Sequence, residues 1–166
     1  MSIQWWIYTN STRSQGELLE FLRSFPDAAP SSEFKSPGLV EFRGHALAKI
    51  CKPRRGAAIS NVDSFGFIET VHVMINRVRN SNTTHLKETI YEIAIRFSDW
   101  EDTADIWFSE NEVGIFKRIE GRFVVNMRKY ENESLQSWLP RDFDRAITPE
   151  AALRTAEQSD EPKSRS

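Results

Sequence analysis

Residues 105–129, DIWFSENEVGIFKRIEGRFVVNMRK, decide the fold class. Runs rich in β-branched and aromatic residues are typical of strands, and here three such runs are separated by turns of only a few residues. Connections this short join neighbouring antiparallel strands, because a parallel pair needs a much longer crossover. The stretch therefore predicts an antiparallel meander with strands at residues 105–109, 113–119 and 122–129.

The N-terminal half predicts further strands and one helix. Ser14 and Glu17 have the spacing of a capping box, and the helical apolar face that follows them is stopped by Pro26. Strand patterns occur at residues 3–9, 38–43, 46–52 and 66–79, and a surface loop is predicted at residues 26–37. We therefore expect an α+β fold: a mainly antiparallel sheet of about six or seven strands with one or two packed helices.

Residues 84–97 fit two patterns. Every second residue from Tyr91 to Phe97 is apolar, as in a strand with one buried face. A helical apolar face runs through the same segment and consists of Leu86, Ile90, Ile93, Ala94 and Phe97. The β-branched and aromatic content favours a strand over residues 89–97, with a helical turn at residues 84–88.

Length and composition indicate one globular domain over residues 1–157. The chain has 166 residues, of which 39% are hydrophobic and 28% charged, as is usual for globular proteins. Residues 131–144 predict a short helix or loop packed on the sheet, and Thr148 can begin a last helix. Residues 158–166 lack apolar anchors, so we expect a disordered C-terminal tail there.

Charge and cysteine content limit the function classes. The net charge of -2 and the pI near 6.0 argue against a general nucleic-acid binder. Cys51 is the single cysteine, which excludes an intrachain disulfide and a multi-cysteine zinc site. The N-terminus lacks the pattern of a secretory signal, and no apolar run has the length of a membrane span. These features predict a soluble cytoplasmic protein with no membrane partner.

No residue pattern indicates a catalytic, cofactor or metal site. A calcium loop counted from Asp99 would be closed by Glu110, but Ala104 stands where such a loop needs glycine. Cys51 has basic neighbours that would lower the pKa of its thiol, yet a nucleophile also needs a base, and free cysteines are mostly buried. We expect a small core side chain at Cys51, and no catalytic residue, cofactor or metal.

Residues 99–112 carry carboxylates and tryptophans but no basic residue. A large aromatic side chain among carboxylates suits the binding of a basic protein, because the charges orient the partner while the aromatic fills a pocket. Trp100 could instead fold back over the edge of the sheet, and the sequence leaves both orientations open. The residues predicted to bind a partner are Asp99, Trp100, Glu101, Asp102, Asp105, Trp107, Glu110 and Glu112.

These features favour a non-catalytic protein that inhibits a basic partner protein, most concretely a bacterial immunity protein that occludes a cognate toxin domain. One alternative is a hydrolase or transferase acting on a nucleotide or another anion, with His72 or a carboxylate as base. Another is a nucleic-acid-binding module, which the charge disfavours. The enzyme would use the basic residues Arg54, Arg55, Arg77 and Arg79 around a pocket. The nucleic-acid-binding module would use the same four residues with Lys49 and Lys52 as a phosphate-binding strip, if their strands are neighbours.

Overall fold

The computed structural model describes residues 3–30, 38–42, 45–54, 56, 65–78, 81, 83–111, 113–126 and 144–146. In chain order its elements are β1 (Gln4–Thr9), α1 (Gln15–Arg23), β2 (Ala28–Pro30), β3 (Leu39–Phe42), β4 (Ala46–Cys51), β5 (Val71–Arg77), α4 (Thr83–Trp100), β6 (Ile106–Glu110), β7 (Val113–Ile119), β8 (Arg122–Asn126) and β9 (Asp144–Ala146). The predicted helix from Thr148, the tail at residues 158–166 and most of residues 131–144 lie outside the described residues.

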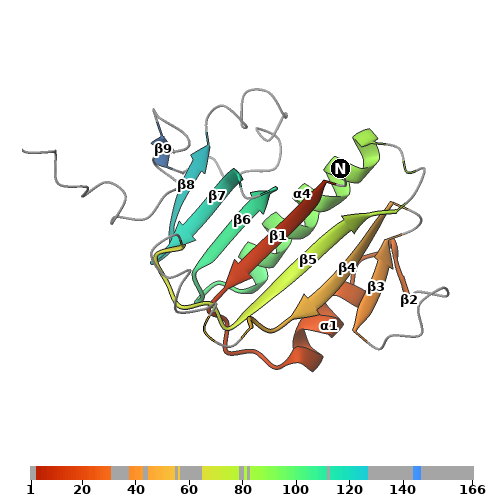
Figure 1. Cartoon of the computed structure of the whole chain (residues 1–166), viewed down its shortest axis with the longest axis horizontal. Coiled ribbons are helices and arrows are strands. Elements are labelled where there is room, and N and C mark those ends of the chain that lie inside the picture. The colour runs from red at the N-terminus through yellow and green to blue at the C-terminus, as the bar shows by residue number, and fades with distance from the viewer. Residues whose placement is uncertain are drawn as a thin grey trace, which may run out of the picture.

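The described strands form one sheet in the order β2-β3-β4-β5-β1-β6-β7-β8-β9 (Figure 1). All neighbouring strands are antiparallel except β8 and β9, which are parallel. The predicted α+β class with a mainly antiparallel sheet is thus confirmed. The described sheet has nine strands, more than the predicted six or seven, because β2 and β9 are edge strands of three residues each. Strands this short carry almost no periodicity, and β2 lies inside the predicted loop.

Helix α1 begins as its sequence predicts. The Ser14 hydroxyl accepts a hydrogen bond from the Glu17 backbone N–H at 3.2 Å, and the Glu17 carboxylate accepts one from the Ser14 backbone N–H at 2.7 Å. This reciprocal pair satisfies two N–H groups that a helix start otherwise leaves without partners. The helix then buries Leu18, Phe21 and Leu22 against the sheet.

The strand predicted at residues 89–97 is wrong, because this segment is the second half of helix α4. Two patterns coincided there because the helix is buried along a wide stripe, which includes Tyr91 and Ile95 beside the narrower apolar face. The exposed side of α4 carries the i,i+4 ion pair between Glu92 and Arg96 at 2.8 Å. Tertiary burial on the sheet therefore outweighs the strand preference of the β-branched residues.

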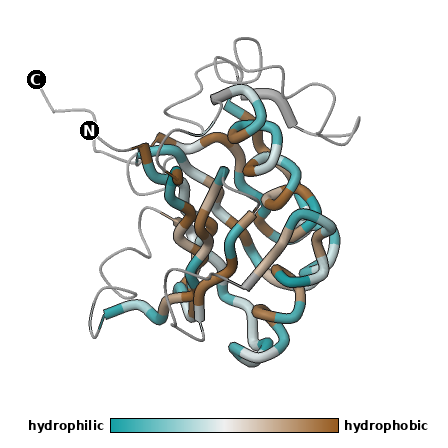
Figure 2. Tube along the Cα trace, turned by 90° about the vertical axis from the view of Figure 1, so that its right-hand side faces the viewer, coloured by the Kyte–Doolittle hydropathy of each residue, from teal (hydrophilic) through white to brown (hydrophobic). Residues whose placement is uncertain are grey.

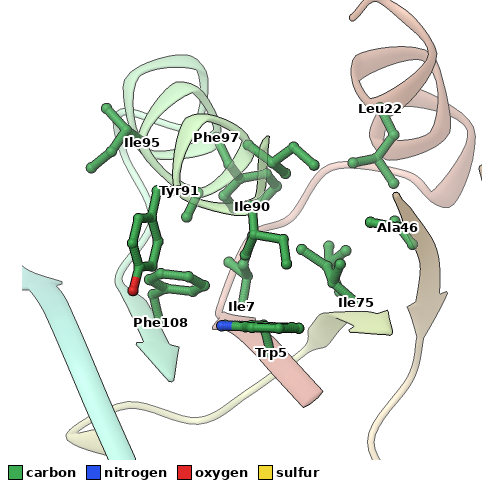
Figure 3. Packing of buried hydrophobic residues seen from close by; sticks show 14 of the residues in the cluster. Trp5, Ile7, Leu22, Ala46, Ile75, Ile90, Tyr91, Ile95, Phe97 and Phe108 are labelled. Atoms are coloured by element: carbon green, nitrogen blue, oxygen red, sulfur yellow. The ribbon is translucent and has the colours of Figure 1, made fainter. Parts of the chain in front are cut away.

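Both described helices lie on the same face of the sheet, behind the strands in Figure 1 and to one side of them in Figure 2. The residues of β1 alternate between this face and the open face. Trp5 and Ile7 are buried beneath Ile90 of α4 (Figure 3), and they belong to one continuous core. Among the described residues, no helix is both long enough and apolar enough to cross a membrane.

The open face of the sheet carries half-buried aromatic side chains, among them Trp6 and Tyr8 of β1. Phe65 stacks on Tyr8 with ring centroids 4.4 Å apart and also contacts Trp107. Phe65, Phe67 and Trp107 form a small second cluster, separate from the main core. Residues 65–70 therefore cover part of this face.

Candidate functional site

The acidic residues predicted as a binding surface do not form one surface. Asp99 and Trp100 are the last residues of α4, and residues 101–105 connect that helix to β6. Glu110 is half-buried at the far end of β6. Glu112 lies outside the described residues. The site that can be built from the described residues is therefore the segment from Asp99 to Asp105.

Glu101 points into the protein, with a residue exposure of only 2%. Its carboxylate accepts hydrogen bonds from the Ser11 hydroxyl and from Arg13 Nε, the latter at 2.9 Å. Thr103 donates to the second carboxylate oxygen at 3.3 Å. Because its hydrogen-bonding capacity is used internally, Glu101 holds the segment in place and is not available to a partner.

Arg118 of β7 contacts the segment from the interior of the protein and is itself only 5% exposed. Its guanidinium donates to the backbone carbonyls of Ser98 and Glu101, and to that of Ala104 at 2.8 Å. These are carbonyls that the end of a helix and the following turn leave without backbone donors. Burial lowers the pKa of Arg118, while the carboxylates of residues 99–105 oppose that shift.

Trp100 packs inward. Its ring stacks on Phe21 of α1 with centroids 4.7 Å apart, and the Arg13 guanidinium lies over the ring at 4.1 Å from its centroid. Arg13 also donates to the Trp100 backbone carbonyl at 3.3 Å. Trp100 is thus part of the contact between α1 and α4, and its placement gives no support to a role as an exposed anchor.

Asp105 is half-buried and joins two turns. Its carboxylate accepts a hydrogen bond from Asn10 Nδ2 at 3.2 Å and one from the Glu120 backbone N–H at 2.9 Å. Its own N–H donates to Asn10 Oδ1 at 2.7 Å. The carboxylates that remain exposed on the segment are those of Asp99 and Asp102.

Trp107 and Glu110 lie apart from these two carboxylates. Trp107 is 7% exposed and packs with Phe65 and Phe67, and Lys117 Nζ lies 5.8 Å from its ring centroid. Phe65 and Phe67 therefore cover Trp107 on the open face of the sheet.

The carboxylates of the segment do not converge on a point. Within the described part of the chain, no group of three or more His, Cys, Asp or Glu side chains is arranged to hold a metal ion. Glu101 and Asp105 are instead bonded to groups of the protein. The two carboxylates of the segment that point outward are those of Asp99 and Asp102.

The basic residues of the alternative hypotheses are dispersed. Lys49 is exposed on β4 and Arg54 is exposed after it. Arg77 donates to the Ser81 hydroxyl at 3.0 Å and to the Ser81 carbonyl at 2.8 Å. Arg55 and Arg79 lie outside the described residues. The phosphate-binding strip proposed from the sequence is therefore not assembled by the residues whose positions are described.

One juxtaposition could not be anticipated from the sequence. Cys51 of β4 lies directly opposite His72 of β5 in the antiparallel ladder, and His72 Nδ1 is paired with the buried carboxylate of Glu69. Cys51 is half-buried on the open face, not a core residue as expected. A register between strands that are distant in sequence leaves no local signal, so no pattern could have revealed this pair.

Comparison with known proteins identifies no relative of this chain. No family model, no curated protein and no solved structure is significantly similar to this chain.

Proposed function

We propose that this chain is a non-catalytic binding protein that inhibits a basic partner protein. The most concrete case is a bacterial immunity protein, acting in the cytoplasm, that occludes a cognate toxin domain. The observation that supports the proposal is the pair of exposed carboxylates, Asp99 and Asp102, on a segment held by Arg13 and Arg118. A charge-bearing segment that is already ordered loses little conformational entropy on binding.

The two carboxylates act through charge. Exposed carboxylates raise the association rate of a basic partner and fix its orientation, and they contribute less to the affinity than a buried anchor does. Enzymes that act on anionic substrates carry basic surfaces, which makes such an enzyme a suitable partner for an acidic inhibitor. With Trp100 packed against Phe21, apolar contacts with the partner must come from neighbouring surface.

The test is the double variant Asp99→Asn/Asp102→Asn. Glu101 is left unchanged, because removing its internal carboxylate would disturb the fold. The control is Glu88→Gln/Glu92→Gln, which removes the same charge from the exposed side of α4, more than one helical turn away. The original chain and the two variants are used to recover partners from the native cell. The recovered partner is then purified, and its binding to each protein is measured at low and high salt.

We expect the Asp variant to bind its partner about tenfold more weakly at low salt and to show a flatter salt dependence, because each interfacial charge pair contributes on the order of a kcal/mol. The control variant should bind as the original chain does. Equal affinities for the Asp variant and the original chain, with the fold intact, would refute the acidic segment as the binding site. The toxin case further requires that co-expression of this chain protects cells from the recovered partner.

A further inference from the structure

The segment that leads into β5 carries the most exposed large apolar side chain of the described residues. Ile68 is 58% exposed, whereas Phe67 and Glu69 on either side of it are buried. The buried neighbours fix the backbone at this position, and the Ile68 side chain faces solvent between them. Because this side chain adds little to the core, the fold itself does not require an apolar residue here.

The chain on both sides of Ile68 is attached to the end of the sheet. The Thr70 N–H, two residues after Ile68, donates to the carbonyl of Thr9 at the end of β1, at 3.0 Å. Two residues before Ile68, Gly66 lies against Ile119 at the end of β7, since a Cβ atom on Gly66 would be 3.9 Å from Ile119 Cδ1. Because β6 lies between β7 and β1, this stretch of chain crosses the start of β6.

The start of β6 is where the acidic segment enters the sheet. Asp105, the last residue of that segment, bonds to Asn10 just after β1 and to the Glu120 N–H just after β7. Neighbouring strands are about 4.8 Å apart, and two residues of extended chain reach about 7 Å. Ile68, at the midpoint of the crossing, therefore lies beside Asp105, at the end of the sheet where β1 and β7 end and β5 and β6 begin (Figure 1).

The charges next to Ile68 on the side of the acidic segment are negative. Asp99 and Asp102 are exposed there, and the guanidinium groups of Arg13 and Arg118 are bonded to the segment from inside. Lys52, an exposed cation near this end of the sheet, follows β4, and β5 and β1 lie between β4 and β6. An apolar side chain bordered by carboxylates is complementary to an apolar pocket bordered by basic residues.

We propose that Ile68 is the apolar anchor of the partner-binding surface, and that the partner is a basic protein with an apolar pocket bordered by Arg or Lys side chains. This inference rests on the proposed function and supplies the apolar contact that Trp100, packed against Phe21, does not provide. The attachment of Thr70 to β1 holds the anchor in place before binding, which lowers the entropic cost of association.

The carboxylates and the anchor affect different rate constants. Exposed charges mainly set the association rate, and their effect is weakened by salt. Burial of an apolar side chain mainly slows dissociation, and it does not depend on the screening of charges. The two contributions can therefore be measured separately in one complex.

The experiment measures the association and dissociation rates of the purified partner with Ile68→Ser, at low and at high salt. The matched control is Val113→Ser, because Val113 is also an exposed large apolar residue but begins β7 at the opposite end of the sheet. Ile68→Val, which keeps most of the apolar surface, is the second variant. Near-ultraviolet circular dichroism confirms that each variant is folded.

We expect the complex of Ile68→Ser to dissociate about tenfold faster than that of the original chain at both salt concentrations, because most of an isoleucine side chain is no longer buried in the partner. Its association rate should change by less than about twofold. Ile68→Val should dissociate about two- to fourfold faster, in keeping with the loss of one methylene group. Val113→Ser should bind as the original chain does.

The outcomes separate this inference from the proposed function. An unchanged dissociation rate for Ile68→Ser, while Asp99→Asn/Asp102→Asn weakens binding, would overturn the anchor and leave the proposed function intact. An effect of Ile68→Ser at low salt alone would also overturn the anchor, since the residue would then act through the neighbouring charges. Unchanged binding of the Asp variant, or recovery of no basic partner by the original chain, would refute the proposed function and the anchor with it.

A second copy of this chain is the other possible occupant of the surface around Ile68. Size-exclusion chromatography of the original chain and of Ile68→Ser tests it. We expect both to elute as the same species. A dimeric original chain and a monomeric Ile68→Ser variant, with equal affinities for the partner, would assign Ile68 to self-association and overturn the proposal.

Discussion

Replacing Arg118 by Met removes the guanidinium that donates hydrogen bonds to backbone carbonyls at the C-terminal end of α4. The methionine side chain keeps the apolar stem but donates no hydrogen bond, so the carbonyls of Ser98, Glu101 and Ala104 lose their donor. Arg118 comes from β7 and is 5% exposed, so water has little access to replace it. The substitution therefore leaves buried acceptors unsatisfied where α4 meets the following segment.

The expected loss of stability is about 3–4 kcal/mol. Breaking one partner of a buried charged interaction costs about 3–5 kcal/mol. Part of this is recovered, because burial of the guanidinium was itself unfavourable and Arg118 Nε has no partner among the described residues. For a chain of this length, 1 kcal/mol corresponds to about 2–4 °C in Tm, so the variant should melt about 6–16 °C lower.

Urea unfolding followed by tryptophan fluorescence measures this loss. The control is Arg96→Gln on the exposed side of α4, which removes an equal charge and a surface ion pair and should cost less than about 1 kcal/mol. Arg118→Lys, which can still donate from a single nitrogen, should fall between the two. If Arg118→Met unfolds within 1 kcal/mol of the control, the carbonyl contacts do not hold the acidic segment, and the rigidity that the proposed function requires has no basis.

Two further variants test the N-terminal cap of α1 and the contact between α1 and α4. The backbone hydrogen bond from Ser14 lowers the pKa of Glu17, so this carboxylate stabilises α1 fully above about pH 4.3, the ordinary value for glutamate, and the contribution is lost as the pH falls through its lower folded pKa. Unfolding measured from pH 6 to pH 3 should therefore show a steeper loss in the original chain than in Glu17→Gln, and identical profiles would contradict the capping role. Trp100→Leu should destabilise the chain by about 1–2 kcal/mol, through the lost contacts with Phe21 and Arg13, without weakening partner binding in the folded protein. Lost binding in a folded Trp100→Leu variant would restore the anchor role.

The parts of the fold that the sequence predicts are those with local causes. The capping box of Ser14 and Glu17 and the closely spaced strands β6 to β8 depend on residues a few positions apart, and both are found. The sequence predicts a strand in the second half of α4 for a tertiary reason. A helix that packs broadly against a sheet buries Tyr91 and Ile95 as well as its narrow apolar face, and the resulting pattern resembles the alternation of a strand. The edge strands β2 and β9 exist only through pairing with their neighbours.

The candidate site shows the same difference between local and distant causes more clearly. The acidic residues of the segment are adjacent in sequence, whereas the groups that decide their roles arrive from elsewhere: Arg13 from before α1, and Arg118 from β7. The pairing of Cys51 with His72 likewise depends on the register of strands separated by residues 52–70. Composition reveals the presence of such groups but not their partners, because strand register and helix docking are properties of the whole sheet.

The negative charge exposed on residues 99–105 is consequently smaller than the sequence indicates. Residues 99–105 contain four carboxylates, but Arg13 and Arg118 offset half of that charge from inside, and Glu101 is withdrawn from the surface altogether. The four carboxylates of this segment therefore do not all have the same role. The inward carboxylate and the guanidinium groups order the segment, and this ordering fixes the positions of Asp99 and Asp102. An acidic run of the same composition without Arg118 would carry more negative charge but would present it on a mobile loop, where each contact with a partner must first overcome the entropy of ordering. Under the proposed function, selectivity for one basic partner would therefore depend on the internal cations as much as on the exposed acids.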